Sequence, residues 1–282
     1  MTAAAPSALP RTCCPSVWLW PGQALYTGPG LDLAPHSGSV WCLAIGVDRP
    51  VTVTACEHVV SARSVLIPPR LTHHLDTHGG RLVSCYLDPT SDRASGCRDK
   101  CRGASGELAF GHADEQALGR PPTDDDAARH WLDIAAPATT RRMDPRIADA
   151  VRRVTADSPA SPSARQLAAD AGLSESRFLH LFRREAGTSL RRYRLWIRLL
   201  RAGVGISAGQ SLTEAAAEAG FASPSHLADR FKSTFGLTAT QLLASGVGPV
   251  PVAVGRRLGR CVPGVPGTGG AASAALWTRA GR

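Results

Sequence analysis

Apolar residues follow a different pattern in each half of the chain. Between residues 22 and 87 they form short runs that lack helical periodicity and are broken by Gly, Pro and Asp. Several short runs at this spacing are typical of a small antiparallel barrel or sandwich, which can enclose one small ligand. We expect strands at residues 24–26, 40–47, 51–55, 65–67 and 82–87.

Helical patterns begin after this β-rich segment. We expect a polar loop at residues 88–103 and two modest helices at 106–118 and 124–136. The acidic run at 124–126 stands where the positive end of the second helix would favour it. Residues 22–136 are therefore expected to form one domain, and residues 137–143 a linker.

The segment from 144 to 245 predicts a second, helical domain. Asp144 and Pro145 are typical of an N-cap followed by proline at the first helical position. A later helix at residues 190–202 has arginines on its outer faces, and Gly203 and Gly205 are expected to end or weaken it. Its apolar stripe consists of Leu190, Tyr193, Ile197 and Leu200.

One pattern in this helical domain occurs twice, at residues 167–187 and 212–236. Each copy has a small residue, then a glycine four residues later, then an aromatic residue. Alanine lets two helices approach closely, and glycine supplies the positive φ of a tight turn, so each copy predicts a helix-turn-helix unit. The matched residues are Ala168, Gly172 and Phe182 in the first copy, and Ala216, Gly220 and Phe231 in the second.

The second helix of each unit divides into an inner and an outer face. The expected inner faces consist of Phe178, Leu181 and Phe182 in the first unit, and of Leu227, Phe231 and Phe235 in the second. The expected outer faces consist of Ser176, Leu179, His180 and Arg183, and of Ser225, His226, Asp229 and Lys232. Because a major groove admits one helix, the outer residues are candidates for contact with base edges.

The charge of the chain is unevenly distributed along it. Residues 1–140 hold 11 Lys and Arg against 14 Asp and Glu, residues 141–245 hold 16 against 9, and residues 246–282 hold 5 against none. Residues 177–201 alone carry eight arginines and one acid, Glu185. An arginine run by itself is compatible with a solvated helix face, but beside two helix-turn-helix units it favours contact with phosphates.

Residues 144–244 resemble the DNA-binding domain of the AraC/XylS family of bacterial transcription regulators. The similarity lies in ADAGLSESRFLHLFR at 169–183 and EAGFASPSHLADRFKSTFG at 218–236. It implies seven helices, with two recognition helices entering successive major grooves on one face of the duplex. The positions that would read bases are Ser176, Leu179, His180, Ser225 and Asp229, and those that would meet phosphates are Arg177, Arg183, Arg184 and Lys232.

Two of these residues depart from simple base reading. Leu179 cannot donate or accept a hydrogen bond and could contact only a thymine methyl group. Asp229 is negatively charged, so it must accept from cytosine N4, pair with Arg230 or stay outside the groove. Specificity could therefore rest mainly on the first unit.

The N-terminal half resembles the cupin-like sensor domain of the same family, chiefly through VLIPPRLTHHLD at 65–76. Arg70 stands where a turn glycine is usual, and His73 is the one residue that matches a metal ligand of cupin enzymes. Since a facial metal site needs about three protein ligands, a cupin-type metalloenzyme is disfavoured. The candidates for an effector pocket are His36, Trp41, His73 and Tyr86.

The eight cysteines have irregular spacing, so we expect free thiols in a reducing compartment. Cys97 and Cys101 form the most suggestive pair, because four residues on a helix would place both sulfurs on one face. With partners such as Cys85, His73 or His112 they could bind a metal, or they could sense redox state. A loop that merely carries two thiols is the alternative.

Together these patterns predict an α+β protein that is not an enzyme and needs no cofactor: a small cupin-like β-barrel with two helices, joined to an all-α domain of about seven helices with two helix-turn-helix motifs. We expect a cytoplasmic regulator that binds double-stranded DNA under the control of a small-molecule effector. It could form a homodimer, would contact RNA polymerase if it activates, and has no membrane role. A thiol-responsive or metal-responsive regulator is the second hypothesis.

Residues 1–21 lack the features of a signal peptide. These residues and the basic Gly/Pro-rich tail at 246–282 are expected to be disordered.

Overall fold

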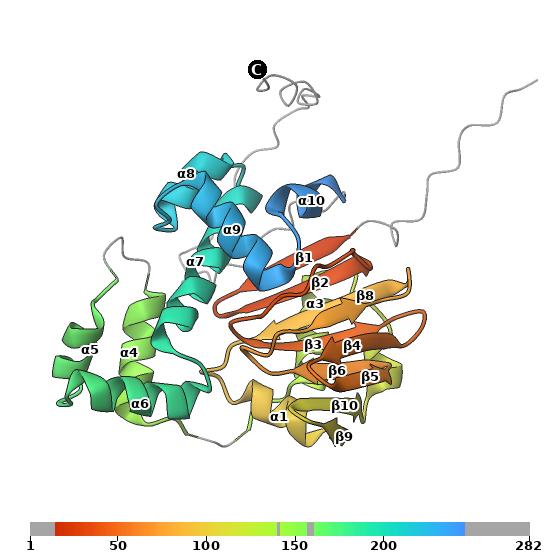
Figure 1. The fold of residues 1–282 in the computed structure, drawn as a ribbon, viewed down its shortest axis with the longest axis horizontal. Helices are drawn as coiled ribbons and strands as arrows, with labels where there is room; N and C mark the ends of the chain where they lie inside the picture. Colours follow the sequence, from red (N-terminus) through yellow and green to blue (C-terminus); the bar gives the residue numbers. More distant parts are fainter. Residues whose placement is uncertain (1–14, 140–141, 157–160, 246–282) are drawn as a thin grey trace, which may run out of the picture.

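The computed structural model describes residues 15–139, 142–156 and 161–245. The N-terminal part contains two antiparallel sheets, and a bundle of helices lies beside them (Figure 1). The larger sheet has the order β1 (Ser16–Trp20), β2 (Gln23–Pro29), β8 (Arg81–Leu87), β3 (Trp41–Gly46), β6 (Ser64–Ile67), β10 (Leu108–His112) and β9 (Cys101–Ser105). The smaller sheet has the order β5 (His58–Ala62), β4 (Val51–Ala55) and β7 (His74–Asp76).

The larger sheet is covered by apolar side chains on both faces. On one face, Leu43 and Ile45 of β3 pack with Trp131 and Leu132 of α3 (Asp125–Ala135). On the other, residues of β3 and β6 form a core with the smaller sheet, which contributes Val53. Helix α3 begins as expected, because the Asp124 carboxylate accepts the Ala127 backbone N–H at 2.8 Å.

Three expectations for this half were wrong. Residues 106–118 contain the end of a hairpin between β9 and β10 and the short helix α2 (Glu115–Leu118), since β10 pairs with β6 and buries Leu108 there. The segment expected as a loop at 88–103 contains α1 (Arg93–Asp99). The disorder expected through residue 21 is contradicted by β1, which pairs with β2 and buries Trp18 and Trp20.

Within the described residues the C-terminal domain contains seven helices, as the sequence predicted. They are α4 (Pro145–Thr155), α5 (Ala164–Asp170), α6 (Glu175–Ala186), α7 (Leu190–Ser207), α8 (Leu212–Glu218), α9 (Pro224–Phe235) and α10 (Ala239–Ala244). The connecting helix, α7, continues through Gly203 and Gly205 instead of ending there. Both glycines allow close packing, because a Cβ would lie 3.1 Å from Leu19 Cδ1 at Gly203 and 2.1 Å from Gln210 Oε1 at Gly205.

Helix α7 and the end of α9 join the helical domain to the sheets (Figure 1). Trp196 is fully buried, and its indole N–H donates to the Gly22 carbonyl at 2.9 Å. At the end of α9, the Gly236 carbonyl accepts the Ala34 backbone N–H at 2.9 Å. A Cβ at Gly236 would lie 2.5 Å from the Ala34 carbonyl oxygen, so the two domains meet here backbone to backbone.

No helix in the described part of the chain combines the length and apolar character needed to cross a membrane. The linker expected at residues 137–143 falls partly outside the described residues, as do the tail at 246–282 and the first 14 residues.

Candidate DNA-binding surface

The first helix-turn-helix unit consists of α5 and α6. Ser163 and Gln166 form a capping box at the start of α5, and Gly172 has the positive φ, 65°, that the turn requires. Phe178 and Phe182 on the inner face of α6 are fully buried, with ring centroids 6.2 Å apart. The expected outer residues of this helix all lie exposed: Ser176, Leu179, His180 and Arg183.

The second unit repeats this construction in α8 and α9. Ser211 and Glu214 form the capping box of α8, the turn glycine Gly220 has φ 79°, and Ser223 caps α9. Leu227 is buried, but Phe231 is only half-buried, so the second unit has a looser interior than the first. Ser225, Asp229 and Lys232 are exposed, and His226 is half-buried.

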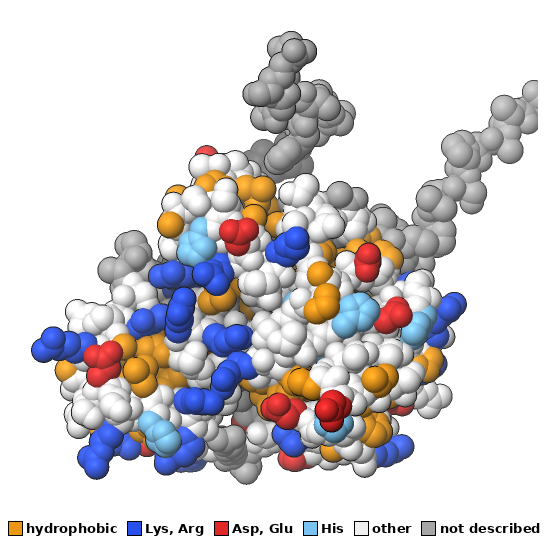
Figure 2. Space-filling view, viewed as in Figure 1, with side chains coloured by type: hydrophobic (Ala, Val, Ile, Leu, Met, Phe, Trp, Pro, Cys, Tyr) orange, Lys and Arg blue, Asp and Glu red, His pale blue; other side chains and the backbone are white. Residues whose placement is uncertain are grey.

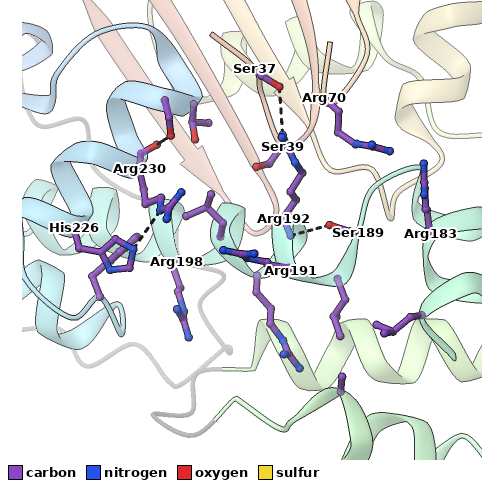
Figure 3. A pocket seen from close by; sticks show the side chains of 18 residues that line it. Ser37, Ser39, Arg70, Arg183, Ser189, Arg191, Arg192, Arg198, His226 and Arg230 are labelled. Carbon is purple, nitrogen blue, oxygen red and sulfur yellow. Dashed lines mark hydrogen bonds between the residues drawn. The ribbon is translucent and has the colours of Figure 1, made fainter. Parts of the chain in front are cut away.

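Helix α7 lies between these two units and forms the floor of a groove. The groove has a volume of about 990 Å³ and is bounded by α6 on one side and α9 on the other. Lys and Arg side chains gather in a band over this region (Figure 2), and Figure 3 shows the groove from close by. Its arginines, here called the groove arginines, are Arg70, Arg183, Arg191, Arg192, Arg194, Arg198 and Arg230.

No Asp or Glu lines this groove among the described residues, and none of the groove arginines forms an ion pair there. Among the described residues, the Arg192 guanidinium donates to two neutral oxygens. They are Ser37 Oγ, at 3.3 Å (Figure 3), and the Gly38 carbonyl, also at 3.3 Å. Burial and the neighbouring charge of Arg70 lower the pKa of Arg192. A row of cations without protein acids is suited to an anionic partner.

Sequence reasoning found part of this groove. Five of its seven arginines lie in the run at 177–201 that was expected to favour phosphates: Arg183, Arg191, Arg192, Arg194 and Arg198. Of these, only Arg183 was named individually as a phosphate contact, and Arg70 was not assigned to the DNA-binding surface. Arg230 was considered as a partner for Asp229, but its Nε donates to His226 Nε2 at 3.2 Å. Among the other expected phosphate contacts, Arg177 and Lys232 are exposed outside the groove, and Arg184 pairs with Glu185 at 3.2 Å.

A family model for a helix-turn-helix domain matches residues 167–245, the segment that contains both units. Residues 167–245 are therefore similar to a helix-turn-helix domain. The structure of an apo single-residue variant of ToxT from Vibrio cholerae is 12% identical to this protein, with a TM-score of 0.52 over 79% of this chain and 97% of that chain. No curated protein sequence matches the chain.

Two further solved structures resemble this protein. Wild-type ToxT from Vibrio cholerae with a bound unsaturated fatty acid is 12% identical, with a TM-score of 0.50 over 80% of this chain and 96% of that chain. A transcriptional regulator with an AraC-type DNA-binding domain, from Chromobacterium violaceum, is 25% identical, with a TM-score of 0.34 over 36% of this chain and 92% of that chain. The ToxT structures confirm the arrangement of a sheet domain followed by a helical domain.

The four residues expected in an effector pocket lie in three different places in the protein. Tyr86 is half-buried against Trp196 and Phe235, with ring centroids 5.8 and 5.3 Å away. Trp41 packs on the other face of the sheet, beside Arg98. His36 and His73 pair across an isolated β-bridge, with ring centroids 4.4 Å apart.

Tyr86 lines a cavity of about 320 Å³ between the two domains of the protein. Its walls come from β1, β2 and β8 on one side and from α7, α9 and α10 on the other. The side chains are almost all apolar, and no Lys, Arg, His, Asp or Glu lines the cavity among the described residues. Residues that meet across it include Leu19, Leu33, Trp196, Ile206 and Phe235.

The His36 and His73 pair predicts a pH-dependent stability. Burial, and then the charge of His36, lower the pKa of His73 to about 4. An unfolded histidine binds its proton near pH 6.5, so stability is complete above that pH and decreases as the pH falls towards 4. Between pH 7.5 and pH 5 we expect this residue to cost about 2 kcal/mol of unfolding free energy, measured by urea denaturation.

His73→Asn provides the control, because asparagine keeps an N–H that can donate to the Leu71 carbonyl, which His73 Nδ1 contacts at 2.9 Å, but does not titrate. This variant should lose correspondingly less stability over the same pH interval. Equal losses in the two proteins would show that His73 does not couple folding to protons.

Cys97 and Cys101 lie close together but not on one helix. Cys97 is buried in the last turn of α1, and Cys101 begins β9, with its Sγ donating to the Cys97 carbonyl at 3.5 Å. The hydrogen bond between the two thiols raises the pKa of Cys97, and burial raises it further. The same hydrogen bond lowers the pKa of Cys101. In the described residues no group of three or more His, Cys, Asp or Glu could hold a metal, so the expected partners do not converge.

Proposed function

We propose that the regulator reads DNA with α6 and α9, which enter successive major grooves on one face of the duplex. The observation that carries this proposal is the groove of seven arginines between the two helices, which no acid neutralises in the described residues. Successive major grooves lie about 34 Å apart, and the DNA backbone between them would cross α7. Positive charge along this path would attract phosphates and release counterions.

Within this proposal the exposed residues divide into two roles. Base edges would meet Ser176, Leu179, His180, Ser225 and Asp229, which all lie on the outer faces. Phosphates would meet Arg177, Arg183, Arg184 and Lys232, together with the remaining groove arginines. Because Arg230 is bonded to His226 and does not neutralise Asp229, base reading by Asp229 is restricted to bases that donate, such as cytosine through N4.

The two roles predict different effects for neighbouring residues of α6. His180→Ala should change the preference at one or two base pairs by about 1–3 kcal/mol each, since a base contact discriminates between sequences. Arg183→Ala should weaken binding to all sequences alike, because a phosphate contact carries no base information. Selection of binding sites from a random duplex library, followed by sequencing, measures both.

Glu175→Ala is the control for base preference, because Glu175 lies in the exposed first turn of α6 and is not assigned to base reading, so its loss should leave the preference profile unchanged. Identical preference profiles for His180→Ala and the unmodified protein would remove His180 from base reading. No salt-sensitive binding of any duplex by the unmodified protein would overturn the proposed function itself.

The effector of this regulator is proposed to bind in the interdomain cavity. Its volume, about 320 Å³, lies in the range of small-molecule sites. Binding there would contact β1, β2 and β8 together with α7 and α9, so it would bias the position of the second helix-turn-helix unit. The similar ToxT structure binds an unsaturated fatty acid, but a carboxylate in this cavity would have no cation beside it among the described residues. We therefore propose an uncharged, largely apolar effector.

We further propose partners beyond DNA and effector. A regulator that activates transcription would contact RNA polymerase in the cytoplasm. The sheet domain offers an edge strand for a homodimer, since β9 (Cys101–Ser105) ends the larger sheet and leaves one row of its backbone groups unpaired within the described sheet.

A further inference from the structure

Arg70 is the one groove arginine that comes from the sheet domain, and its backbone is strained. It lies in the turn between β6 and β7 with φ 75°, a left-handed conformation that favours glycine. Its backbone N–H donates to the Gly38 carbonyl at 2.9 Å, which holds the turn in place. A glycine here would avoid the strain, so local folding does not account for the arginine.

The side chain of Arg70 extends from the sheet domain and points toward Arg183 of α6 (Figure 3). It is exposed and lines the groove together with Arg183 of α6 and Arg192 of α7. The charge of Arg70 acts on Arg192, whose own partners are neutral oxygens. Two like charges in one groove repel each other, and an anion between them offsets this repulsion because it attracts both.

We propose that Arg70 binds a backbone phosphate of the DNA that crosses the groove, which makes the sensor domain part of the DNA-binding surface. This inference rests on the proposed function, because it names a further contact of the same surface. A single small anion would neutralise one or two of seven guanidinium groups, whereas a DNA strand supplies a row of phosphates along the groove. Movement of the sheet domain relative to α7 would then withdraw a DNA contact directly.

The test compares Arg70→Gly and Arg70→Gln with Arg120→Gln in the full chain. Arg120 is exposed after α2 and does not line the groove, so its substitution removes the same charge elsewhere. Binding to one duplex of about 40 bp is measured between roughly 50 and 200 mM salt. Loss of one phosphate contact should make the negative slope of log affinity against log salt shallower by about 0.9. The difference in affinity between the variant and the unmodified protein should therefore become about 3.5-fold smaller from the lowest to the highest salt concentration.

Arg70→Gly should show this loss while its thermal unfolding temperature stays equal to or above that of the unmodified protein, because glycine tolerates the left-handed turn. Arg70→Gln tests the charge even if the glycine variant unfolds early. Slopes that match that of Arg120→Gln for both variants would overturn the role of Arg70. If the unmodified protein binds no duplex, the proposed function fails instead, so the two failures are distinguishable.

Discussion

Replacing Trp196 by alanine should lower the free energy of unfolding by about 3–5 kcal/mol, the cost of truncating a large buried aromatic residue. Trp196 belongs to α7 but packs against Tyr86 of the sheet domain and Phe235 of α9. Truncation would remove both contacts and leave the buried Gly22 carbonyl without its indole donor. Urea unfolding followed by far-ultraviolet circular dichroism measures the change.

Trp196→Phe separates the ring contacts from the hydrogen bond. Phenylalanine keeps an aromatic ring but cannot donate to Gly22, so we expect a smaller loss of roughly 1–3 kcal/mol. Trp41→Ala is the comparison within a single domain, since Trp41 is half-buried on the opposite face of the sheet. A loss below about 1 kcal/mol in Trp196→Ala would show that α7 does not depend on this residue for docking.

The helix-turn-helix units could be predicted from the sequence because their signals are local. A capping box spans four residues and a turn glycine acts on its own backbone, so Ser163, Gln166 and Gly172 carry the same meaning in any surrounding structure. The prediction of the inner faces was less accurate. Phe231 stands at the position of the second copy that matches Phe182, but Phe182 is fully buried whereas Phe231 borders a cavity. The second unit is therefore less tightly filled than its sequence pattern implies.

The run at 177–201 predicted most of the charge of the arginine groove, but the shape of the groove could not be predicted, because docking of the two domains assembles it. Arg70, Arg192 and Arg230 are far apart in the chain and meet only when α7 packs on the sheet domain. The hairpin of β9 and β10 was missed for a similar reason. Its residues CRGASGELAFGH have no strong strand pattern, and pairing of β10 with β6 decides their structure.

The largest ligand effect should come from an uncharged apolar molecule in the interdomain cavity. A long-chain unsaturated fatty alcohol at about 100 times its Kd should stabilise the folded protein by about 2.7 kcal/mol, which raises the Tm of a chain this size by roughly 5–10 °C. The corresponding fatty acid at neutral pH should raise it less, because the cavity places no cation beside a carboxylate among the described residues. Differential scanning fluorimetry with both ligands measures the difference.

Two tryptophan substitutions on α7 locate the effect. Ile206 lines the cavity, so Ile206→Trp should fill part of it and reduce the shift produced by the alcohol. Val204 is half-buried on the same helix but does not line the cavity, so Val204→Trp should leave the shift intact. An equal shift in both variants would place the ligand elsewhere, and a larger shift with the acid would contradict an uncharged effector.

The same cavity borders Phe235 near the end of α9, so a ligand bound in the cavity should also change the affinity for DNA. Ile206→Trp should remove that coupling.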